Sequence, residues 1–141
     1  MIAVAKTDDE IQNCYAVMAE LRPHLEEKDF LQRIKKQQAT DRYELAFLET
    51  SKEIKAVAGF RTGVCLAWNK FLYVDDLVTK SGERSNGYGQ ALFDWLVNYA
   101  KKNGCDEFHL DSGVHRFKAH RFYLQKRMDI VSHHFGLKLK N

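Results

Sequence analysis

The chain has 141 residues, of which 45% are apolar and 29% charged, with a single proline. This length and composition predict one domain over residues 1–141 with a single hydrophobic core. No apolar run approaches the roughly 20 residues that a membrane-spanning helix needs. The formal net charge of +3 is well below the basic excess typical of nucleic-acid-binding proteins. We therefore expect neither a membrane nor a nucleic acid as a partner.

The cysteines and histidines do not form metal-binding patterns. Cys14, Cys65 and Cys105 are widely spaced and include no Cys-x-x-Cys pair, which favours reduced thiols. His115 and His120 are five residues apart, so a helix would place them on different sides. No metal site is predicted. Because the N-terminus also lacks a basic and then apolar leader, we expect a cytoplasmic protein.

Apolar periodicity and turn residues predict the elements in chain order. Thr7 and Glu10 form a capping-box pattern before a helix that continues until Pro23. A second amphipathic helix carries Phe30 and Ile34. The later elements are strands at 43–48 and 54–62 that form a hairpin, a strand at 71–79, a helix from Gly89 to Asn103, a strand at 107–110, a helix at 117–126 and a closing strand pair between Ile130 and Leu139. This order predicts an α/β or α+β domain with a mixed sheet.

The junction between the third strand and its helix is typical of an anion site, because Gly87 and Gly89 permit close approach to a helix N-terminus. A P-loop would need Lys where Gln90 stands, and a Rossmann turn would need a glycine at Leu92. The remaining pattern is Arg-x-x-Gly-x-Gly, which begins at Arg84. It resembles the pyrophosphate loop of the GCN5-related N-acetyltransferases (GNAT family).

A second region resembles the same family. Ala119 and Tyr123 match the pattern Asn-x-x-Ala-x-x-x-Tyr-x-x-x-Gly that family members carry after the fifth strand. Arg116 stands where the family often has asparagine, and Arg127 stands where it usually has glycine. The order of the predicted elements also matches this fold, a mixed and mostly antiparallel sheet flanked by helices.

The resemblance implies an acyltransferase that moves acetyl from acetyl-coenzyme A to a primary amine, by direct attack within a ternary complex. The acceptor would be a small cationic amine or a protein or peptide amine. Tyr123 is implied as the general acid for the departing thiolate, although a tyrosine here could also simply fill the core. The implied cofactor contacts are Leu77, Val78, Thr79, Arg84, Ser85, Asn86, Gly87, Tyr88, Gly89, Gln90 and Arg116.

Asp75 and Asp76 are adjacent carboxylates in an otherwise apolar strand, so alternation sends one to each face. The resemblance implies Asp75 as base and Asp76 as a substrate contact, but alternation leaves open which of them faces inward. A strand bulge that exposes both to water is the alternative. Together with Glu20, Glu26, Glu27 and Asp29, these acids favour a cationic acceptor.

A rival hypothesis is a non-catalytic coenzyme A sensor or interaction module on the same fold. The departures from the family pattern at Arg116 and Arg127 are compatible with this hypothesis. A homodimer is a further expectation from the resemblance.

Overall fold

A computed structural model describes residues 1–141, which divide into two compact units, Met1–His109 and Leu110–Asn141. The elements of the first unit are β1 (Ile2–Val4), α1 (Asp8–Asn13), α2 (Tyr15–Leu21), α3 (Glu27–Asp41), β2 (Tyr43–Thr50), β3 (Glu53–Cys65), β4 (Asn69–Thr79), the 3₁₀ turn η1 (Arg84–Asn86), α4 (Tyr88–Lys102) and β5 (Glu107–Leu110), whose last residue begins the second unit. The second unit contains α5 (Phe117–Gln125).

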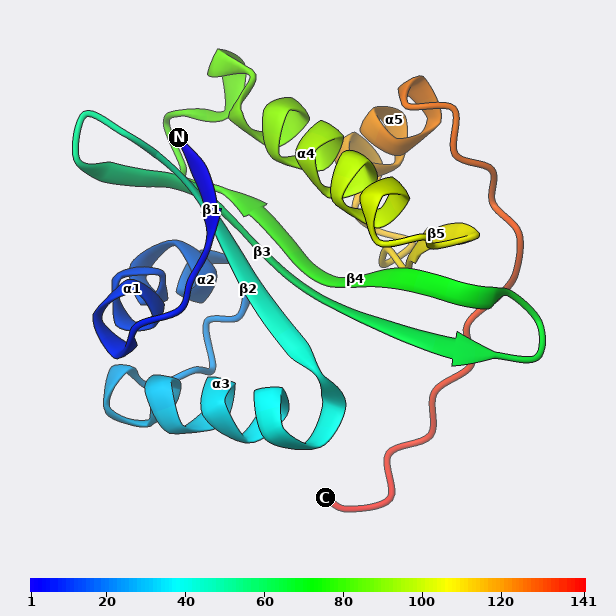
Figure 1. The fold of residues 1–141 in the computed structure, drawn as a ribbon, viewed down its shortest axis with the longest axis horizontal. Helices are drawn as coiled ribbons and strands as arrows, with labels where there is room; N and C mark the ends of the chain where they lie inside the picture. The colour runs from blue at the N-terminus through cyan, green and yellow to red at the C-terminus, as the bar shows by residue number, and fades with distance from the viewer. The chain divides into compact units, whose positions relative to one another are not determined.

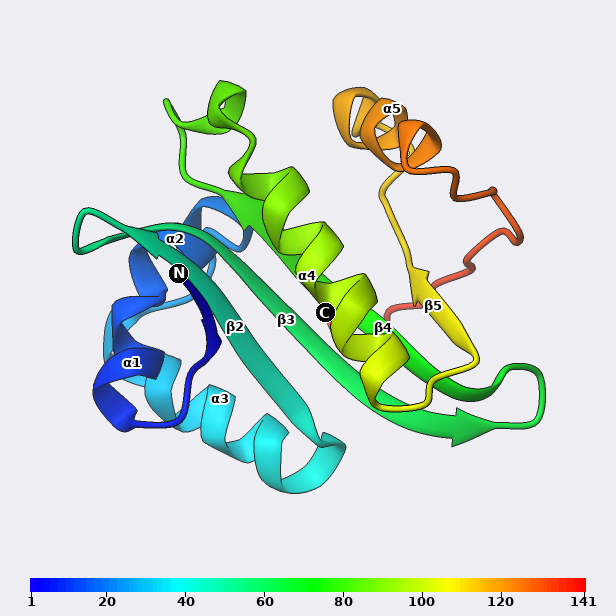
Figure 2. The ribbon, with the colours of Figure 1, turned by 45° about the horizontal axis from the view of Figure 1, so that its top comes forward.

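The sheet follows the chain, in the order β1-β2-β3-β4-β5. Its first four strands are antiparallel neighbours, and β5 joins β4 after the crossover helix α4. Figure 1 and Figure 2 show α1, α2 and α3 on one face of this sheet and α4 on the other. The predicted fold class, an α+β domain with a sheet flanked by helices, is confirmed.

Each face of the sheet has its own apolar layer. Phe30 and Ile34 of α3 are buried against the strands together with Met18 of α2. On the opposite face, Phe60 of β3 is fully buried and meets the rings of Trp95 and Tyr99 from α4 edge to face, with centroids 6.4 and 5.2 Å away. These two layers hold both sets of helices on the strands that carry the candidate site.

The capping box at the first helix is present. The Glu10 amide donates to the Thr7 hydroxyl over 3.1 Å, and the Glu10 carboxylate accepts from the Thr7 amide over 3.0 Å. The single helix predicted up to Pro23 is instead two helices, α1 and α2, with Cys14 as the cap residue between them. The Cys14 amide donates to the Ile11 carbonyl, the tighter i to i−3 bond that often closes a helix.

The closing strand pair predicted between Ile130 and Leu139 is wrong, because no strand follows α5. Alternating apolar residues form a strand only where a neighbouring strand accepts their backbone hydrogen bonds, and this segment has none. Its apolar side chains are exposed instead, namely Ile130, Val131, Phe135, Leu137 and Leu139. The sequence also gave no signal for β1, whose three residues are too few to show alternation.

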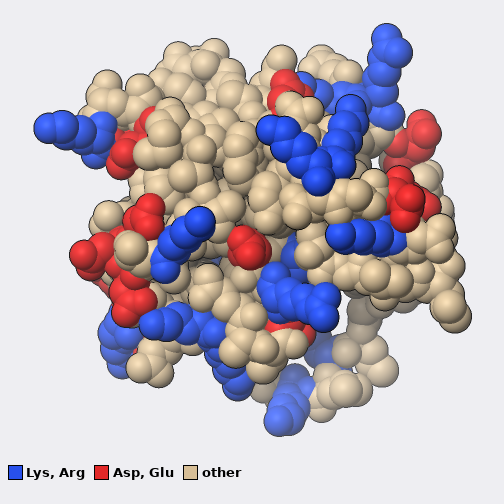
Figure 3. Space-filling view, in the orientation of Figure 1, with Lys and Arg blue, Asp and Glu red and all other residues tan.

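The charged surface is mixed. On the face in Figure 3, basic and acidic side chains lie among one another rather than in separate fields. No helix combines the length and the apolar character needed to cross a bilayer.

Candidate functional site

A β-bulge in β4 shapes the first part of the candidate site. Gly59 of β3 pairs with Asp76, whereas the next residue, Phe60, pairs with Val74, so Asp75 is the extra residue. A bulge interrupts the alternation of side chains along a strand. The strict alternation expected for the two aspartates therefore does not hold. The bulge considered as the alternative is present, but it does not expose both carboxylates to water, since the side chains of Asp75 and Asp76 are 25% and 14% exposed.

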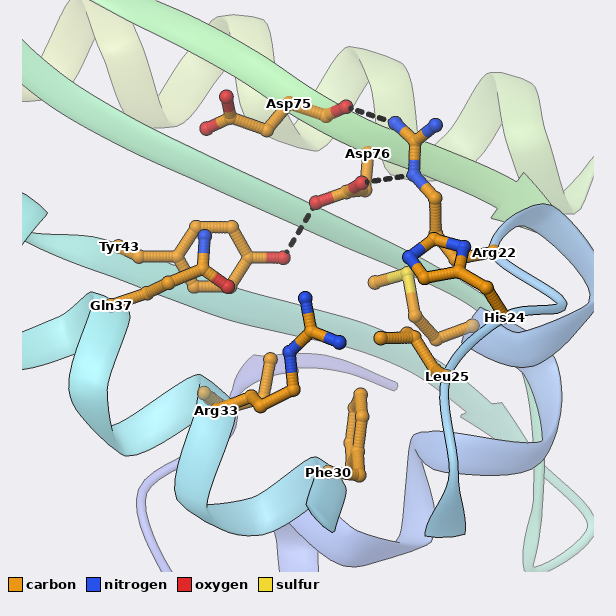
Figure 4. Close-up of a pocket in the computed structure, with 11 residues that line it drawn as sticks. Arg22, His24, Leu25, Phe30, Arg33, Gln37, Tyr43, Asp75 and Asp76 are labelled. Carbon is orange, nitrogen blue, oxygen red and sulfur yellow. Dashed lines mark hydrogen bonds and ion pairs between the residues drawn. The ribbon is translucent and has the colours of Figure 1, made fainter. Parts of the chain in front are cut away.

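Asp76 faces a pocket and is held from two sides. Its carboxylate accepts a hydrogen bond from the hydroxyl of Tyr43 on β2 over 2.8 Å and from Nε of Arg22 over 2.9 Å. Figure 4 shows both contacts. Burial, followed by the charge of Asp76, raises the pKa of Tyr43 well above its ordinary value of 10, so the phenol remains a proton donor.

Asp75 makes a different set of contacts. Its carboxylate accepts from Nε of Arg61 over 3.0 and 3.3 Å, while its backbone carbonyl accepts from the guanidinium of Arg22 over 3.0 Å. In Figure 4 the carboxylate points away from Arg22. Burial raises the pKa of Asp75 above its ordinary value, and the neighbouring Arg61 opposes that increase. A carboxyl with a raised pKa is a better proton acceptor than an ordinary surface aspartate.

The pocket beside Asp76 has a volume of about 360 Å³. Its walls come from the end of α2, the connection to α3, one stripe of α3 and the start of β2. The lining residues are Met18, Arg22, His24, Leu25, Phe30, Arg33, Ile34, Gln37, Tyr43, Asp75 and Asp76.

Sequence reasoning missed the basic side of this pocket. Phe30, Arg33, Ile34 and Gln37 follow the spacing i, i+3, i+4 and i+7, so they share one stripe of α3. Arg33 and Gln37, the two polar residues in that otherwise apolar stripe, were the feature of the sequence that could have indicated a pocket here. The acids that favoured a cationic acceptor, Glu20, Glu26, Glu27 and Asp29, do not line the pocket.

The glycine-bearing loop has the geometry of an anion site. Gly87 precedes α4 with φ 78°, a left-handed conformation, and no side chain caps the helix. A Cβ on Gly89 would lie 2.9 Å from the hydroxyl oxygen of Thr79, so only glycine fits without a shift. The first N–H groups of α4, from Tyr88 to Gln90, therefore remain available to an anion at its positive end.

Two anchors hold the chain in front of this loop. The carboxylate of Glu20, on α2, accepts from the backbone amide of Ser81 over 2.9 Å and from its hydroxyl. Glu83 accepts from the buried ammonium of Lys55 over 3.1 Å and from the amide of Asn86 over 2.6 Å. These contacts lower the pKa of Glu83, so it stays ionised.

Arg84 lies in the loop with 65% of its side chain exposed. Its Nε is 3.4 Å from the Thr79 carbonyl, and its guanidinium is 4.0 Å from the Glu20 carboxylate. Both contacts are long, so an anion would compete for this guanidinium with little loss of existing bonds. Ser85 and Asn86 complete the turn η1 beside it.

The end of β4 offers a free backbone edge. Leu77, Val78 and Thr79 pair with β3 on one side only. On the other side, β5 starts opposite Lys70, whose carbonyl accepts from the Asp106 amide over 2.7 Å. Because β5 has only four residues, it extends along β4 to about Val74. The backbone groups of residues 77–79 can therefore accept another strand-like partner.

Tyr123 and Arg116 belong to the second unit, where both lie on or beside α5. Arg116 is the N-cap residue of that helix, and its backbone carbonyl accepts from the His120 amide over 3.0 Å. Tyr123 is half-buried. Burial raises its pKa and the Arg116 charge opposes the rise, so the phenol stays protonated at neutral pH.

No three of the His, Cys, Asp and Glu side chains in residues 1–141 gather as a metal site would require.

Comparison with known proteins relates the whole arrangement to one family. The model of the acetyltransferase (GNAT) family matches residues 8–129. An N-acetyltransferase of Bacillus subtilis (strain 168), YhdJ, is 36% identical over 118 residues, which cover 84% of this chain and 83% of the relative.

Solved structures share the fold at lower identity. A transcriptional regulator from Bacillus halodurans C-125 superposes with a TM-score of 0.83 at 22% identity, over 100% of this chain and 99% of that one. A GNAT family acetyltransferase from Staphylococcus aureus subsp. aureus USA300_TCH1516 gives a TM-score of 0.76 at 20% identity, over 100% and 98% of the two chains. From the family match and the Bacillus subtilis relative together, the chain belongs to the acetyltransferase (GNAT) family.

Proposed function

We propose that this protein transfers the acetyl group of acetyl-coenzyme A to a primary amine of a small molecule or peptide, by direct attack within a ternary complex. The observation that carries the proposal is the uncapped start of α4, which the glycine-bearing loop connects to the free edge of a bulged β4. The assignment of residues 1–141 to one catalytic domain is part of this proposal, as are a homodimer and a cytoplasmic location.

The residues around the loop fit the cofactor. The N–H groups of Gly87, Tyr88, Gly89 and Gln90 would bind the pyrophosphate, with the exposed guanidinium of Arg84 as a charged donor. The backbone of residues 77–79 would hydrogen-bond the pantetheine arm in the manner of an added strand. Ser85, Asn86 and Arg116 complete the proposed set of contacts.

Acetyl-coenzyme A supplies a thioester carbonyl for attack. The amine must be neutral to attack it, so its proton goes to a base, and we assign this role to Asp75, reached through water. Asp76 would contact the amine with the lone pairs that Tyr43 and Arg22 leave free. As the C–N bond forms and the C–S bond breaks, Tyr123 would give its proton to the departing sulfur.

The first test is thermal unfolding with acetyl-coenzyme A, free coenzyme A and NAD. A ligand at 100 times its Kd stabilises the native state by about 2.7 kcal/mol, which should raise the Tm by several degrees. Stabilisation by both coenzyme A species but not by NAD supports the cofactor assignment. If none of the three ligands shifts the Tm, the cofactor assignment is wrong.

Turnover separates an enzyme from a coenzyme A sensor. We expect release of free coenzyme A when acetyl-coenzyme A and an acceptor amine are both present. Tyr123→Phe should lower kcat by about 100-fold while binding of acetyl-coenzyme A persists. Tyr99→Phe is the matched control. Tyr99 is on α4 and packs against Phe60 of β3, so its replacement should leave kcat unchanged. Equal kcat values for Tyr123→Phe and the wild type would exclude Tyr123 as the acid.

A further inference from the structure

The charges in the pocket beside Asp76 are not those of a site for a simple cation. Both carboxylates already have an arginine partner, since Asp76 accepts from Arg22 and Asp75 accepts from Arg61. A cationic acceptor would have to compete with these guanidinium groups for the same oxygens. The two aspartates therefore supply less attraction for a cation than the sequence suggested.

Arg33 is the unmatched cation of this pocket. It lines the cavity, and it makes no ion pair or hydrogen bond with any other residue. Figure 4 shows its guanidinium reaching from α3 into the space between Phe30, Tyr43 and His24. Two other basic residues of α3 are paired, since Lys28 lies 3.4 Å from Glu26 and Lys35 lies 2.9 Å from Asp8. Lys36 also has no ion pair, but it does not line the pocket.

Neighbouring polar groups could share an anion with Arg33. Gln37 lies one turn further along the same stripe of α3, and His24 lies on the connection from α2. A guanidinium binds a carboxylate through two parallel N–H donors, and an amide or imidazole N–H can add a third. This donor set suits a planar anion with two oxygens.

One part of the lining is apolar, and the space is small. Met18, Phe30 and Ile34 are buried in the wall, and Leu25 lies beside them. A volume of about 360 Å³ is near the lower end of pockets that bind small molecules, which start at about 300 Å³. The pocket therefore fits a compact molecule with an apolar body, in addition to the anion.

We infer that the acceptor is a small amine that carries its own carboxylate, with the size of a free amino acid and an apolar side chain. This inference rests on the proposed acetyl transfer to an amine. Arg33 holds the carboxylate, the apolar wall receives the side chain, and the amine faces β4. Arg33 is thus a specificity residue, whereas the reacting amine lies at the other end of the acceptor, beside Asp75 and Asp76.

The test compares acceptors that differ only in the carboxylate. The full chain is incubated with acetyl-coenzyme A and each common L-amino acid, its carboxamide, or the polyamine spermidine, and release of coenzyme A is followed. We expect kcat/KM for at least one apolar amino acid to exceed that of its carboxamide and of spermidine by about 10-fold or more.

Two variants assign this preference to one side chain. Arg33→Gln should remove most of this preference. The kcat/KM of the amino acid divided by that of its carboxamide should fall by about 10- to 100-fold, chiefly because KM for the amino acid rises. Lys36→Gln is the matched control, because Lys36 lies on the same helix outside the pocket, and it should keep the wild-type ratio.

The outcomes separate this inference from the proposed function. Acetylation of carboxamides or spermidine at least as fast as of every amino acid overturns the carboxylate assignment and leaves acetyl transfer standing. Stabilisation by acetyl-coenzyme A without acetylation of any amino acid also overturns it, as does an unchanged ratio in Arg33→Gln. The absence of both stabilisation and coenzyme A release overturns the proposed function as well.

Discussion

The hydroxyl of Tyr43 and the carboxylate of Asp76 meet over 2.8 Å in the space that a side chain at Gly59 would occupy. A Cβ built on Gly59 would lie 1.6 Å from the Tyr43 oxygen and 2.7 Å from an Asp76 oxygen. Gly59 pairs with Asp76 across β3 and β4, directly beside the bulge. The contact between Tyr43 and Asp76 therefore depends on a glycine in the strand between them.

Gly59→Ala should displace Tyr43 and break this hydrogen bond. Because Tyr43 is only 2% exposed and has little room to move, we expect a loss of about 2 to 3 kcal/mol in the free energy of unfolding, measured with urea. Gly63→Ala is the control on the same strand, where the new Cβ would meet only the end of the Phe71 ring. An equal or smaller loss for Gly59→Ala than for Gly63→Ala would contradict the prediction.

Tyr43 should make the protein sensitive to alkaline pH. Its pKa is 10 in the unfolded chain and well above 10 in the native state, so the native state keeps a proton that the unfolded state loses. A raised native pKa gives stability that is fully present below pH 10 and is lost as the pH rises further. The loss should be about 1.4 kcal/mol per pH unit above pH 10.

Tyr43→Phe isolates this effect, because phenylalanine has nearly the same shape and no proton to lose. Urea unfolding of both proteins from pH 8 to pH 11 should show the stability of the wild type falling more steeply than that of the variant, starting at about pH 10. Parallel curves above pH 10 would mean that the native pKa of Tyr43 is not raised.

Most of the fold could be predicted because its elements carry local signals. The capping box at Thr7, the apolar stripe of α4 and the stop at Asn103 and Gly104 each act within a few residues of chain. The bulge at Asp75 could only be considered as an alternative, because it depends on the register between β3 and β4. Local signals alone cannot fix how two strands align.

The candidate site was predictable only in part for the same reason. The loop from Arg84 to Gln90 is continuous in sequence and was found from its glycines. Arg22 and Tyr43 come to Asp76 from the end of α2 and from β2, and nothing in their own sequence neighbourhoods marks them as its partners. Arg33 joins the same pocket from α3. Tertiary packing thus places two arginines beside the two aspartates, and local sequence patterns do not show that.

Gly89→Ala should weaken binding of acetyl-coenzyme A without unfolding the protein. The new methyl group would lie 2.9 Å from the Thr79 hydroxyl oxygen, so the first turn of α4 must move away from β4. We expect Kd to rise by about 10-fold, since displaced N–H groups lose the short distances that anion binding needs. Isothermal titration measures this directly.

The double variant Gly89→Ala/Thr79→Ala provides the control for that loss. Removing the Thr79 hydroxyl opens the space for the new methyl group while the Thr79 backbone remains in β4. Most of the lost affinity should return. A Kd in the double variant as high as in Gly89→Ala alone would show that steric contact with Thr79 is not the cause.

Arg127→Gly should stabilise the protein. Arg127 follows α5 with φ 65°, and its amide donates to the Leu124 carbonyl while the Met128 amide donates to the Tyr123 carbonyl. These two bonds define a Schellman helix end, in which the left-handed residue is usually glycine. A side chain in that conformation costs about 1 to 2 kcal/mol, more than the backbone entropy that glycine loses on folding. We expect a gain of about 0.5 to 1 kcal/mol in the free energy of unfolding.

Arg121→Gly is the matched control, because Arg121 is exposed in the middle of the same helix. There glycine should destabilise the protein by about 1 kcal/mol, since it has a lower helix propensity than arginine and relieves no left-handed backbone conformation. Urea unfolding of the two variants should therefore give changes of opposite sign. If both variants lose stability, the left-handed conformation at Arg127 does not strain the native chain, and the arginine at this position is as well suited to the helix end as glycine.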